Sequence, residues 1–271
     1  MPGNSPASAR VVKGLARSPT RVAQIARPAA AVQIPLMPKP IALVTGATEG
    51  IGRAIAMALG AEGYAVAVTA RTGPKVAALV GELTSGGITA VGIRADVADS
   101  TSVAQLVDSV TRELGPVGVL VNNAGIAIAK PFLETSLEEW DQTFATNVRS
   151  LYLVTRATLP GMIAAGQGDI INIASLAGKN GIANAAAYCA SKHAVLGFSR
   201  SLMLEVRKQG VRVIAICPGS VDTPLLRASP AFSPNWDRIL KPEDVAALVV
   251  DALRLSRRAT ISELEIRPSN P

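Results

Sequence analysis

The sequence TGATEGIG, at positions 45–52, decides the fold class of this 271-residue chain. It directly follows a short apolar run, Ile41–Thr45, and a helical segment comes after it. Glycines there let the backbone turn sharply and approach a pyrophosphate, while the start of the helix supplies free N–H groups. A glycine cluster between a strand and a helix therefore predicts an α/β unit that binds a dinucleotide.

Six further apolar runs follow Ile41–Thr45 and together with it predict seven strands. They are Tyr64–Thr69, Ala90–Ala95, Val117–Asn122, Asp169–Ala174, Val211–Cys217 and Glu263–Ile266. Most are almost continuously apolar, which is typical of strands covered on both faces. Segments with helical periodicity lie between them, among them Val103–Leu114, Trp140–Ile163 and Ala194–Arg207. Repeated β–α units predict a single doubly wound, Rossmann-type domain over residues 39–271, with a parallel seven-stranded sheet and helices on both faces.

Residues 1–38 differ in composition from the rest and are interpreted as a separate extension. Six of the 27 basic residues and none of the 20 acidic ones lie in residues 1–40, which leaves 21 basic and 20 acidic residues elsewhere. A nucleic-acid-binding domain would keep a basic surplus on its folded part, so we expect no nucleic-acid partner. The extension is either disordered or a transit peptide for a mitochondrial or plastid matrix, and otherwise we expect a cytoplasmic protein.

Composition narrows the class further. Hydrophobic residues make up 49% of the chain and charged residues 17%, which is typical of a folded domain. No apolar run approaches the roughly 18 residues of a membrane span, so no membrane partner is expected. Cys189 and Cys217 lie in apolar segments and are predicted to be buried free thiols. His193 is the only histidine, is predicted to lie at the surface, and leaves no cluster of metal ligands.

The end of the second predicted strand indicates which dinucleotide is bound. A carboxylate about 20 residues after the glycines usually accepts hydrogen bonds from the ribose hydroxyls and selects NAD. Here Ala70 stands at that place and Arg71 follows it. A guanidinium matches a 2′-phosphate in charge and geometry, so the sequence predicts NADP(H) in preference to NAD(H). The alternative is that Arg71 is a solvated arginine at a strand end.

The pentapeptide YCASK, at positions 188–192, is the candidate catalytic element. Residues four apart share a helix face, so the Lys192 ammonium can approach the Tyr188 phenol or a cofactor ribose. A nearby positive charge favours the phenolate, and the pattern therefore predicts a pKa of Tyr188 below the usual value of about 10. The phenol could then exchange protons with a substrate oxygen. Tyr188 could instead be a half-buried packing residue.

These motifs together resemble the short-chain dehydrogenase/reductase family. The resemblance rests on the glycine spacing G-x-x-x-G-x-G, the sequence NNAG at positions 122–125 and the Tyr-x-x-x-Lys element, and it covers about residues 39–267. Ser175 stands thirteen positions before Tyr188 and matches the family serine, and Asn147 matches the family asparagine.

The resemblance implies direct hydride transfer between the nicotinamide C4 and a carbonyl carbon. It implies that Tyr188 supplies or removes the proton and that Ser175 orients the substrate oxygen. Lys192 would tune Tyr188 and hold the ribose, and Asn147 would support a water link toward the lysine.

The resemblance also implies which residues contact the cofactor. Asp96 would bind the adenine, and Thr223 would contact the carboxamide or a phosphate. Glu49 departs from the pattern, because NADP-using members often place a basic residue there. The full cofactor-binding set is Gly46, Thr48, Glu49, Gly50, Ile51, Gly52, Arg71, Asp96, Val97, Asn123, Ala124, Gly125, Tyr188, Lys192, Pro218, Gly219, Val221 and Thr223.

Substrate choice is predicted to lie in the segment from Pro224 to Leu240. The segment is interpreted as an apolar lid over the site, and it contains Leu225, Leu226, Phe232 and Trp236. Prolines at 230 and 234 limit its backbone conformations. Arg227 and Arg238 are candidates for binding a carboxylate or a phosphopantetheine group, or they are solvated.

The chain ends shortly after Arg267-Pro268, which resembles the family branch that acts on 3-hydroxy acids and small carbonyls. We therefore expect a carbonyl reductase or alcohol dehydrogenase for a 3-hydroxy acid or related ketone. The alternatives are a 3-oxoacyl-[acyl-carrier-protein] reductase and, from another class, a non-catalytic NADP(H)-binding sensor or scaffold. The family usually forms homodimers or homotetramers through its long helices, here Leu137–Ile163 and Ala186–Lys208.

Overall fold

Seven parallel strands form one sheet in the computed structural model, which describes residue 3, residues 41–229 and residues 234–269. The strands run in the order β3-β2-β1-β4-β5-β6-β7. Their bounds are β1 (Ile41–Thr45), β2 (Val66–Ala70), β3 (Ala90–Arg94), β4 (Val117–Asn122), β5 (Gly168–Ile173), β6 (Val211–Pro218) and β7 (Glu263–Ile266). The strand order reverses between β1 and β4, which is where open α/β sheets bind their ligands. The predicted doubly wound α/β fold is confirmed.

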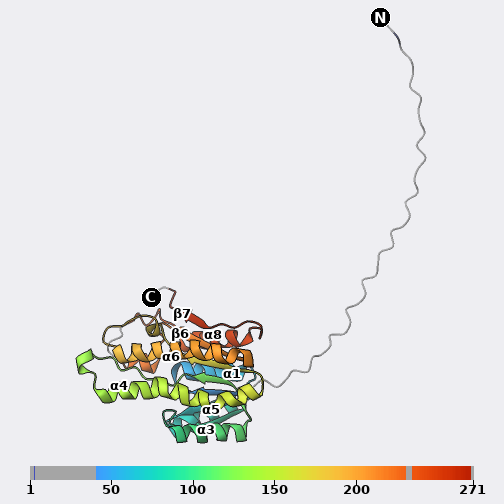
Figure 1. Cartoon of the computed structure of the whole chain (residues 1–271), viewed down its shortest axis with the longest axis horizontal. Coiled ribbons are helices and arrows are strands. Elements are labelled where there is room, and N and C mark those ends of the chain that lie inside the picture. Colours follow the sequence, from blue (N-terminus) through green and yellow to red (C-terminus); the bar gives the residue numbers. More distant parts are fainter. Residues whose placement is uncertain (1–2, 4–40, 230–233, 270–271) are drawn as a thin grey trace. The chain divides into compact units, whose positions relative to one another are not determined.

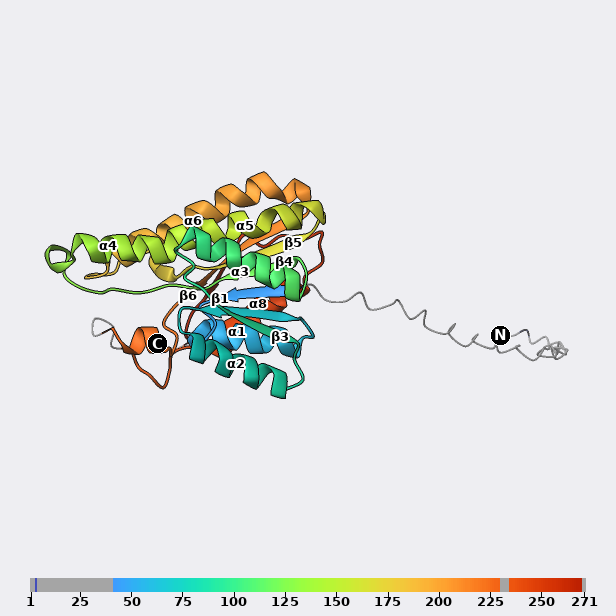
Figure 2. The same cartoon turned by 90° about the horizontal axis from the view of Figure 1, so that it is seen from below.

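Helices cover both faces of this sheet (Figure 1). Figure 2 shows α3, α5 and α6 over one face and α1, α2 and α8 over the other. Within the sheet, Leu43 of β1 packs with the first layer, whereas its neighbours Ala42 and Val44 pack with the second. The helix bounds are α1 (Gly50–Ala61), α2 (Gly73–Ser85), α3 (Ser100–Glu113), α4 (Leu137–Phe144), α5 (Ser150–Ala164), α6 (Ala186–Val206), α7 (Pro224–Arg227) and α8 (Pro242–Arg254).

Four strands, β2, β3, β5 and β6, begin or end away from their predicted positions, because pairing sets their bounds. Tyr64 belongs to the turn after α1, since its N–H donates to Leu59 O. β2 therefore begins at Val66 and continues to Ala70, which pairs with Arg94. β3 ends at Arg94, one residue before its predicted end. β5 begins and ends one residue earlier than predicted, at Gly168 and Ile173, and β6 continues to Pro218.

The segment predicted as one helix, Trp140–Ile163, contains a break in its regular geometry. A π-helical turn, Ala145–Arg149, joins α4 to α5. The helix also begins before Trp140, because Ser136 caps it: the Ser136 hydroxyl accepts from the Glu139 N–H while the Glu139 side chain accepts from the Ser136 N–H.

Other predictions about these parts of the chain have clear outcomes. Cys189 and Cys217 are free and buried, as predicted. His193 is exposed, and its Nδ1 lies 2.9 Å from Cys189 O. Among the described residues, none of the helices has both the length and the apolar character that crossing a membrane requires. The extension predicted for residues 1–38 lies outside the described residues, apart from residue 3.

Candidate active site

The glycine loop between β1 and α1 forms one wall of a cavity. Gly46 and Gly50 have φ angles of +60° and +54°, in the left-handed region that glycine adopts without strain. A Cβ at Gly52 would lie 2.4 Å from Gly46 O, so only glycine lets α1 begin this close to the loop. Glu49 makes no side-chain capping bond, and the first turn of α1 holds no acidic residue. This helix start can therefore receive an anion.

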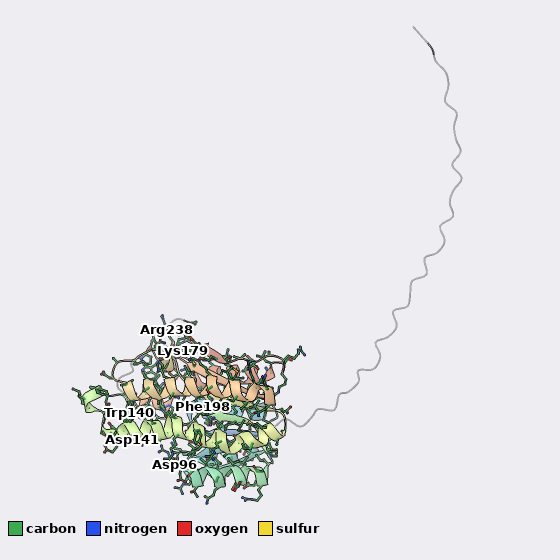
Figure 3. All side chains as sticks on the ribbon, viewed as in Figure 1. Asp96, Trp140, Asp141, Lys179, Phe198 and Arg238 are labelled. Atoms are coloured by element: carbon green, nitrogen blue, oxygen red, sulfur yellow. The ribbon has the colours of Figure 1, made fainter. Side chains whose placement is uncertain are left out.

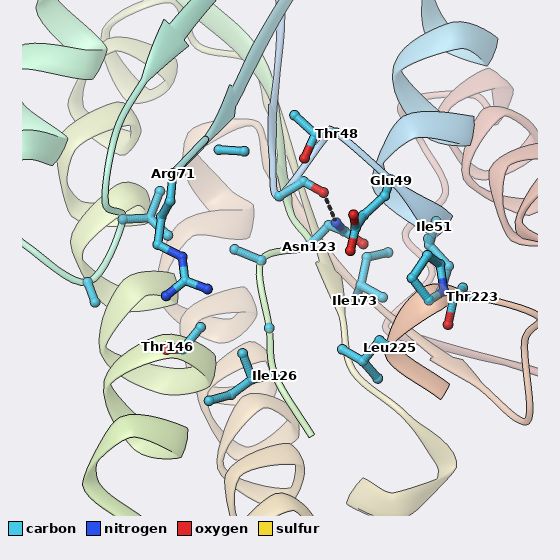
Figure 4. A pocket seen from close by; sticks show the side chains of 18 of the residues that line it. Thr48, Glu49, Ile51, Arg71, Asn123, Ile126, Thr146, Ile173, Thr223 and Leu225 are labelled. Atoms are coloured by element: carbon cyan, nitrogen blue, oxygen red, sulfur yellow. Dashed lines mark hydrogen bonds between the residues drawn. The ribbon is translucent and has the colours of Figure 1, made fainter. Parts of the chain in front are cut away.

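Asn123 ties the glycine loop to the end of β4. Its Nδ2 donates to Thr45 O and to Gly46 O, each at 3.0 Å. Figure 4 shows one of these two hydrogen bonds. In return the Thr45 hydroxyl accepts from the backbone N–H groups of Asn123 at 3.0 Å and Ala124 at 3.1 Å. The ends of β1 and β4 are thus held together at the point where the strand order reverses.

The first cavity has a volume of about 550 Å³ and is lined by polar and apolar groups alike. Figure 4 shows Arg71 on one side of it and Glu49 with Thr48 on the other. Asp96, exposed beyond β3 (Figure 3), accepts from the Ala98 N–H through Oδ1. The predicted cofactor residues that line this cavity are Gly46, Thr48, Glu49, Gly50, Ile51, Arg71, Asp96, Val97, Asn123, Ala124, Gly125, Tyr188, Lys192 and Thr223. Its loop, helix start and guanidinium suit a dinucleotide.

A second, more apolar cavity of about 710 Å³ adjoins the first. Ser175 lines it, as do Pro218, Gly219 and Val221, which were predicted to contact the cofactor but do not line the first cavity. The two cavities share five lining residues: Ile51, Ala174, Tyr188, Thr223 and Leu225. A ligand in either cavity would therefore reach the Tyr188 side chain.

Lys192 and Tyr188 lie on α6 at this junction. The buried Lys192 Nζ donates to Ile173 O at 2.8 Å and lies 5.8 Å from the centre of the Tyr188 ring. Burial lowers the pKa of Lys192 to about 8. Burial also raises the pKa of Tyr188, and a hydrogen bond with Ser175 offsets this only in part. The predicted lowering of the Tyr188 pKa is therefore wrong for the protein alone, because desolvation of the phenolate outweighs a lysine that is directed at a carbonyl.

Asn147 lies in the π turn and lines neither cavity. Its Oδ1 accepts from the Ile126 N–H at 2.8 Å, and its Nδ2 donates to Ile126 O at 2.9 Å and to Ser191 Oγ at 3.0 Å. A Cβ at Gly125 would lie 3.3 Å from Asn147 Oδ1 and 3.8 Å from Lys192 Nζ. Asn147 thus fixes the chain that follows the NNAG sequence, next to Lys192.

The predicted lid contains α7 and is fastened at its base. Asp222 Oδ1 accepts from Arg227 Nε at 2.6 Å and Oδ2 from Lys241 Nζ at 2.9 Å, and these bonds lower the pKa of Asp222 to about 2. Arg227 also lies 4.4 Å from the Trp236 ring centre. Neither Arg227 nor Arg238 is among the described residues that line these two cavities, so their predicted contact with a carboxylate is not supported. Phe232 lies outside the described residues.

The family model of the short chain dehydrogenases matches residues 40–233. The chain belongs to this family. The match spans the glycine loop, NNAG, Ser175 and Tyr-x-x-x-Lys, and a short-chain dehydrogenase is an oxidoreductase.

Known proteins that resemble this short-chain dehydrogenase include one much longer chain and chains of similar length. It is 37% identical to glycine betaine reductase ATRR of Emericella nidulans over 84% of this chain, but it spans only 18% of that protein's length. It is 44% identical to a Streptomyces coelicolor protein named for ketoacyl reduction, over 68% of this chain and 72% of that protein.

Two solved structures share the fold closely. The actinorhodin polyketide ketoreductase with NADPH matches with a TM-score of 0.79 and 35% identity, over 85% of this chain and 96% of that one. The closed form of serine dehydrogenase with NADP⁺ matches with a TM-score of 0.79 and 32% identity, over 85% and 96% of the two chains.

Two charged residues line the cavities of this short-chain dehydrogenase without having been assigned from the sequence. Arg267 is the only charged residue among the described residues that line the second cavity, and its Nη2 lies 2.8 Å from Glu265 Oε2. Lys75, in the first turn of α2, lines the first cavity. Arg267 follows β7 directly, so its place at a carboxyl strand end was the signal available in the sequence.

Proposed function

We propose that the protein is an NADP(H)-dependent oxidoreductase that interconverts a small ketone and the corresponding secondary alcohol. The observation that carries this proposal is the meeting of the two cavities at Tyr188. The cavity with Arg71 suits the dinucleotide, and the more apolar one with Ser175 suits a carbonyl compound. The structural relatives that hold NADPH and NADP⁺ support the choice of cofactor.

Different residues of the first cavity would bind different parts of the cofactor. The glycine loop and the start of α1 would hold the pyrophosphate, Asp96 the adenine and Arg71 the 2′-phosphate. Lys192 would hold the nicotinamide ribose through the N–H groups that Ile173 O leaves unused. NADP(H), when bound, supplies or accepts the hydride, and the protein positions the reacting groups.

Tyr188 would move the proton. Its raised pKa keeps the hydroxyl protonated at neutral pH, so it can donate a proton to the oxygen of a ketone as that oxygen gains charge. Ser175, which hydrogen-bonds with Tyr188, would hold the same oxygen. In alcohol oxidation the phenol must first lose its proton, and the charge on Lys192 favours that loss. Asn147 would support the proton path by fixing the chain beside Lys192.

The substrate that we propose is a 3-hydroxy acid or the related 3-oxo acid. Arg267 supplies a cation in a cavity that is otherwise lined by uncharged residues, and a carboxylate could replace Glu265 as its partner. The likeness to serine dehydrogenase is consistent with a small hydroxy acid. A second candidate is a 3-oxoacyl thioester carried by an acyl carrier protein, which the relative named for ketoacyl reduction and the apolar lining favour.

We further propose a homodimer or homotetramer. Large apolar side chains remain exposed on the long helices, among them Leu137, Tyr152 and Leu204. Such side chains on α4, α5 and α6 would be buried by a second copy of the chain.

Oxidation of NADPH and NADH, followed by absorbance with a panel of ketones, 3-oxo acids, their methyl esters and 3-oxoacyl thioesters, tests this function. We expect turnover with NADPH, and we expect Tyr188→Phe to lower it by about 10³-fold or more, since the proton donor is removed. NADPH binding by the variant, measured by fluorescence, should be unchanged. Turnover that survives this substitution would contradict the role of Tyr188.

Arg267→Met distinguishes the substrates. For a 3-oxo acid we expect KM to rise about tenfold or more, because its carboxylate loses the guanidinium that binds it. KM for the methyl ester should stay the same, because the ester has no negative charge. Equal effects on acid and ester would exclude carboxylate recognition by Arg267. NADPH binding without turnover on any compound would favour the non-catalytic sensor.

A further inference from the structure

Lys75 and Glu49 form an ion pair across the wall of the first cavity. Lys75 Nζ lies 2.9 Å from Glu49 Oε2, and both residues line the cavity together with Arg71. Glu49 belongs to the glycine loop before α1, whereas Lys75 belongs to the first turn of α2. The pair therefore joins two segments of the cavity wall, with Glu49 across the cavity from Arg71 (Figure 4).

Among the described residues, Glu49 is the anion that pairs with Lys75, whose position in α2 is otherwise unfavourable. A cation in the first turn of a helix opposes the positive end of the helix dipole. The first turn of α2 holds no acidic residue, and its N-cap Thr72 makes no side-chain capping bond. Arg94 adds a further cation, since its Nε donates to Arg71 O at 3.0 Å. Positive charge is thus gathered beside Arg71, and Glu49 compensates only part of it.

We propose that Lys75 is a second residue that selects the 2′-phosphate of NADP(H), together with Arg71. Lys75 Nζ would bind the phosphate, with Glu49 keeping the ammonium at the cavity and competing with the phosphate for it. The ion pair also explains how a carboxylate, Glu49, is tolerated in the glycine loop of a protein that binds NADP(H). A carboxylate in the glycine loop would repel a phosphate, but the ammonium from α2 neutralises it. The inference rests on the proposed NADP(H) binding and needs no particular substrate.

Binding of adenosine 2′,5′-bisphosphate, measured by calorimetry on the full-length protein, tests the role of Lys75. We expect Lys75→Met to weaken this binding about five- to tenfold, since an exposed charged hydrogen bond to phosphate is lost. NADH binding, measured by nicotinamide fluorescence, should change less than twofold, because NADH lacks the 2′-phosphate. Lys75→Arg should keep most of the affinity for the bisphosphate.

Arg53→Met is the matched control. Arg53 of α1 pairs with Glu82 of α2, so this variant also removes one positive charge and one ion pair that involves α2, outside the glycine loop. Arg53 does not line the first cavity. We expect no change in the binding of either ligand.

Glu49→Gln tests the competition. We expect the bisphosphate to bind about two- to threefold more tightly, because a like charge is removed from the phosphate. The gain should be larger when Lys75→Met is already present, since Glu49 is then not neutralised. The double variant should therefore recover part of the lost affinity.

Two results would overturn the inference. An unchanged affinity of Lys75→Met for the bisphosphate would show that the pair with Glu49 is only structural. An equal loss for NADH would show that Lys75 acts on the rest of the nucleotide and not on the 2′-phosphate. Neither result depends on turnover, so a protein that reduces no ketone could still bind the bisphosphate through Lys75.

Discussion

The two ends of the β5–β6 pair hold buried charges that are used in opposite ways. At the amino ends, Asp169 and Arg212 face each other in register, and Asp169 accepts from Arg212 Nε at 2.6 Å and from Arg257 Nη2 at 2.8 Å. Arg212 Nη1 donates to Leu255 O, and its Nη2 donates to Leu253 O. At the carboxyl ends, the Nζ of buried Lys192 donates to Ile173 O alone among the described residues.

The difference separates charge that stabilises the fold from charge that serves a ligand. The amino-end cluster satisfies its own hydrogen-bonding groups, so removing one member leaves a buried charge without its partner. At the carboxyl ends, the Lys192 ammonium and the Tyr188 phenol, whose pKa is raised, both line a cavity. Keeping these polar groups there for a ligand lowers the stability of the fold. Stability and function should therefore respond separately to substitutions at the two ends.

Asp169→Asn has the largest expected effect on stability. It leaves buried Arg212 without its carboxylate, and we expect the free energy of unfolding to fall by about 3 kcal/mol. Urea unfolding measures this. Turnover by the folded variant at low temperature should stay within twofold of the wild type. Asp251→Asn, which breaks an exposed pair with Arg254, is the control and should cost less than about 0.5 kcal/mol. A large loss of turnover from Asp169→Asn would contradict the separation of stability and function between the two ends of β5 and β6.

Lys192→Met should act in the opposite direction on stability and abolish turnover. Burial lowers the pKa of Lys192 to about 8, below the usual value of 10.5, so the folded chain disfavours its charge. We expect the variant to be more stable by about 2 kcal/mol at pH 7. Below pH 8 the lysine is protonated in both states and the full cost is present. As pH rises from 8 to 10.5, the folded state loses its proton first, so the gain should shrink.

Urea unfolding of Lys192→Met at pH 7 and pH 9.5 measures this dependence. Lys208→Met, at an exposed position just after α6, is the control for the loss of a surface lysine and should change the free energy of unfolding by less than about 0.5 kcal/mol. A variant less stable than the wild type at pH 7 would mean that the bond to Ile173 O outweighs the cost of the buried charge.

The pH dependence of catalysis should follow Tyr188. Alcohol oxidation needs the phenolate, and the pKa of Tyr188 is raised, so we expect the oxidation rate to climb by up to about tenfold per pH unit above neutrality. Ketone reduction needs the phenol and should stay constant from about pH 6 to 7.5. Steady-state rates in both directions check this. An oxidation rate that already levels off at pH 7 would show that Lys192 and bound cofactor overcome the effect of burial.

Thr69→Val should give the smallest effect. The fully buried Thr69 hydroxyl, at the carboxyl end of β2, has no hydrogen-bond partner among the described residues. We expect about 1 kcal/mol of added stability, since an unpaired buried hydroxyl is replaced by a methyl group of similar shape. Thr45→Val is the matched control: its hydroxyl serves Asn123, Ala124 and Val121, so this change should destabilise the protein.

The sequence predicted the sheet well because its strands are short apolar runs covered on both faces. It placed the ends of β2 and β6 less well, since pairing with neighbours sets them. Local motifs singled out Arg71, Ser175, Tyr188 and Lys192, all of which line one or both of the cavities. These motifs lie at strand ends or within one helix, so spacing alone indicates that they meet.

Contacts between distant segments were not predictable in the same way. Lys75 reaches the glycine loop only because α2 packs beside α1, and Arg267 lines the same cavity as Ser175 only because β7 completes the sheet. The raised pKa of Tyr188 has the same origin. A motif shows that a lysine is near, but burial by the rest of the fold determines which effect on the phenol is larger.

The π turn at Ala145–Arg149 also changes the angle about the helix axis between the side chains of α4 and those of α5. Such a turn closes with one residue more than an α-helical turn. Each extra residue rotates the following side chains by about 100° about the axis. The faces of α4 and α5 are therefore out of phase, and Asn147 stands where the phase changes. Deleting one residue in this turn would leave a regular helix but would turn α4 by more than a quarter of a revolution relative to α5, and the grip of Asn147 on Ile126 would be lost.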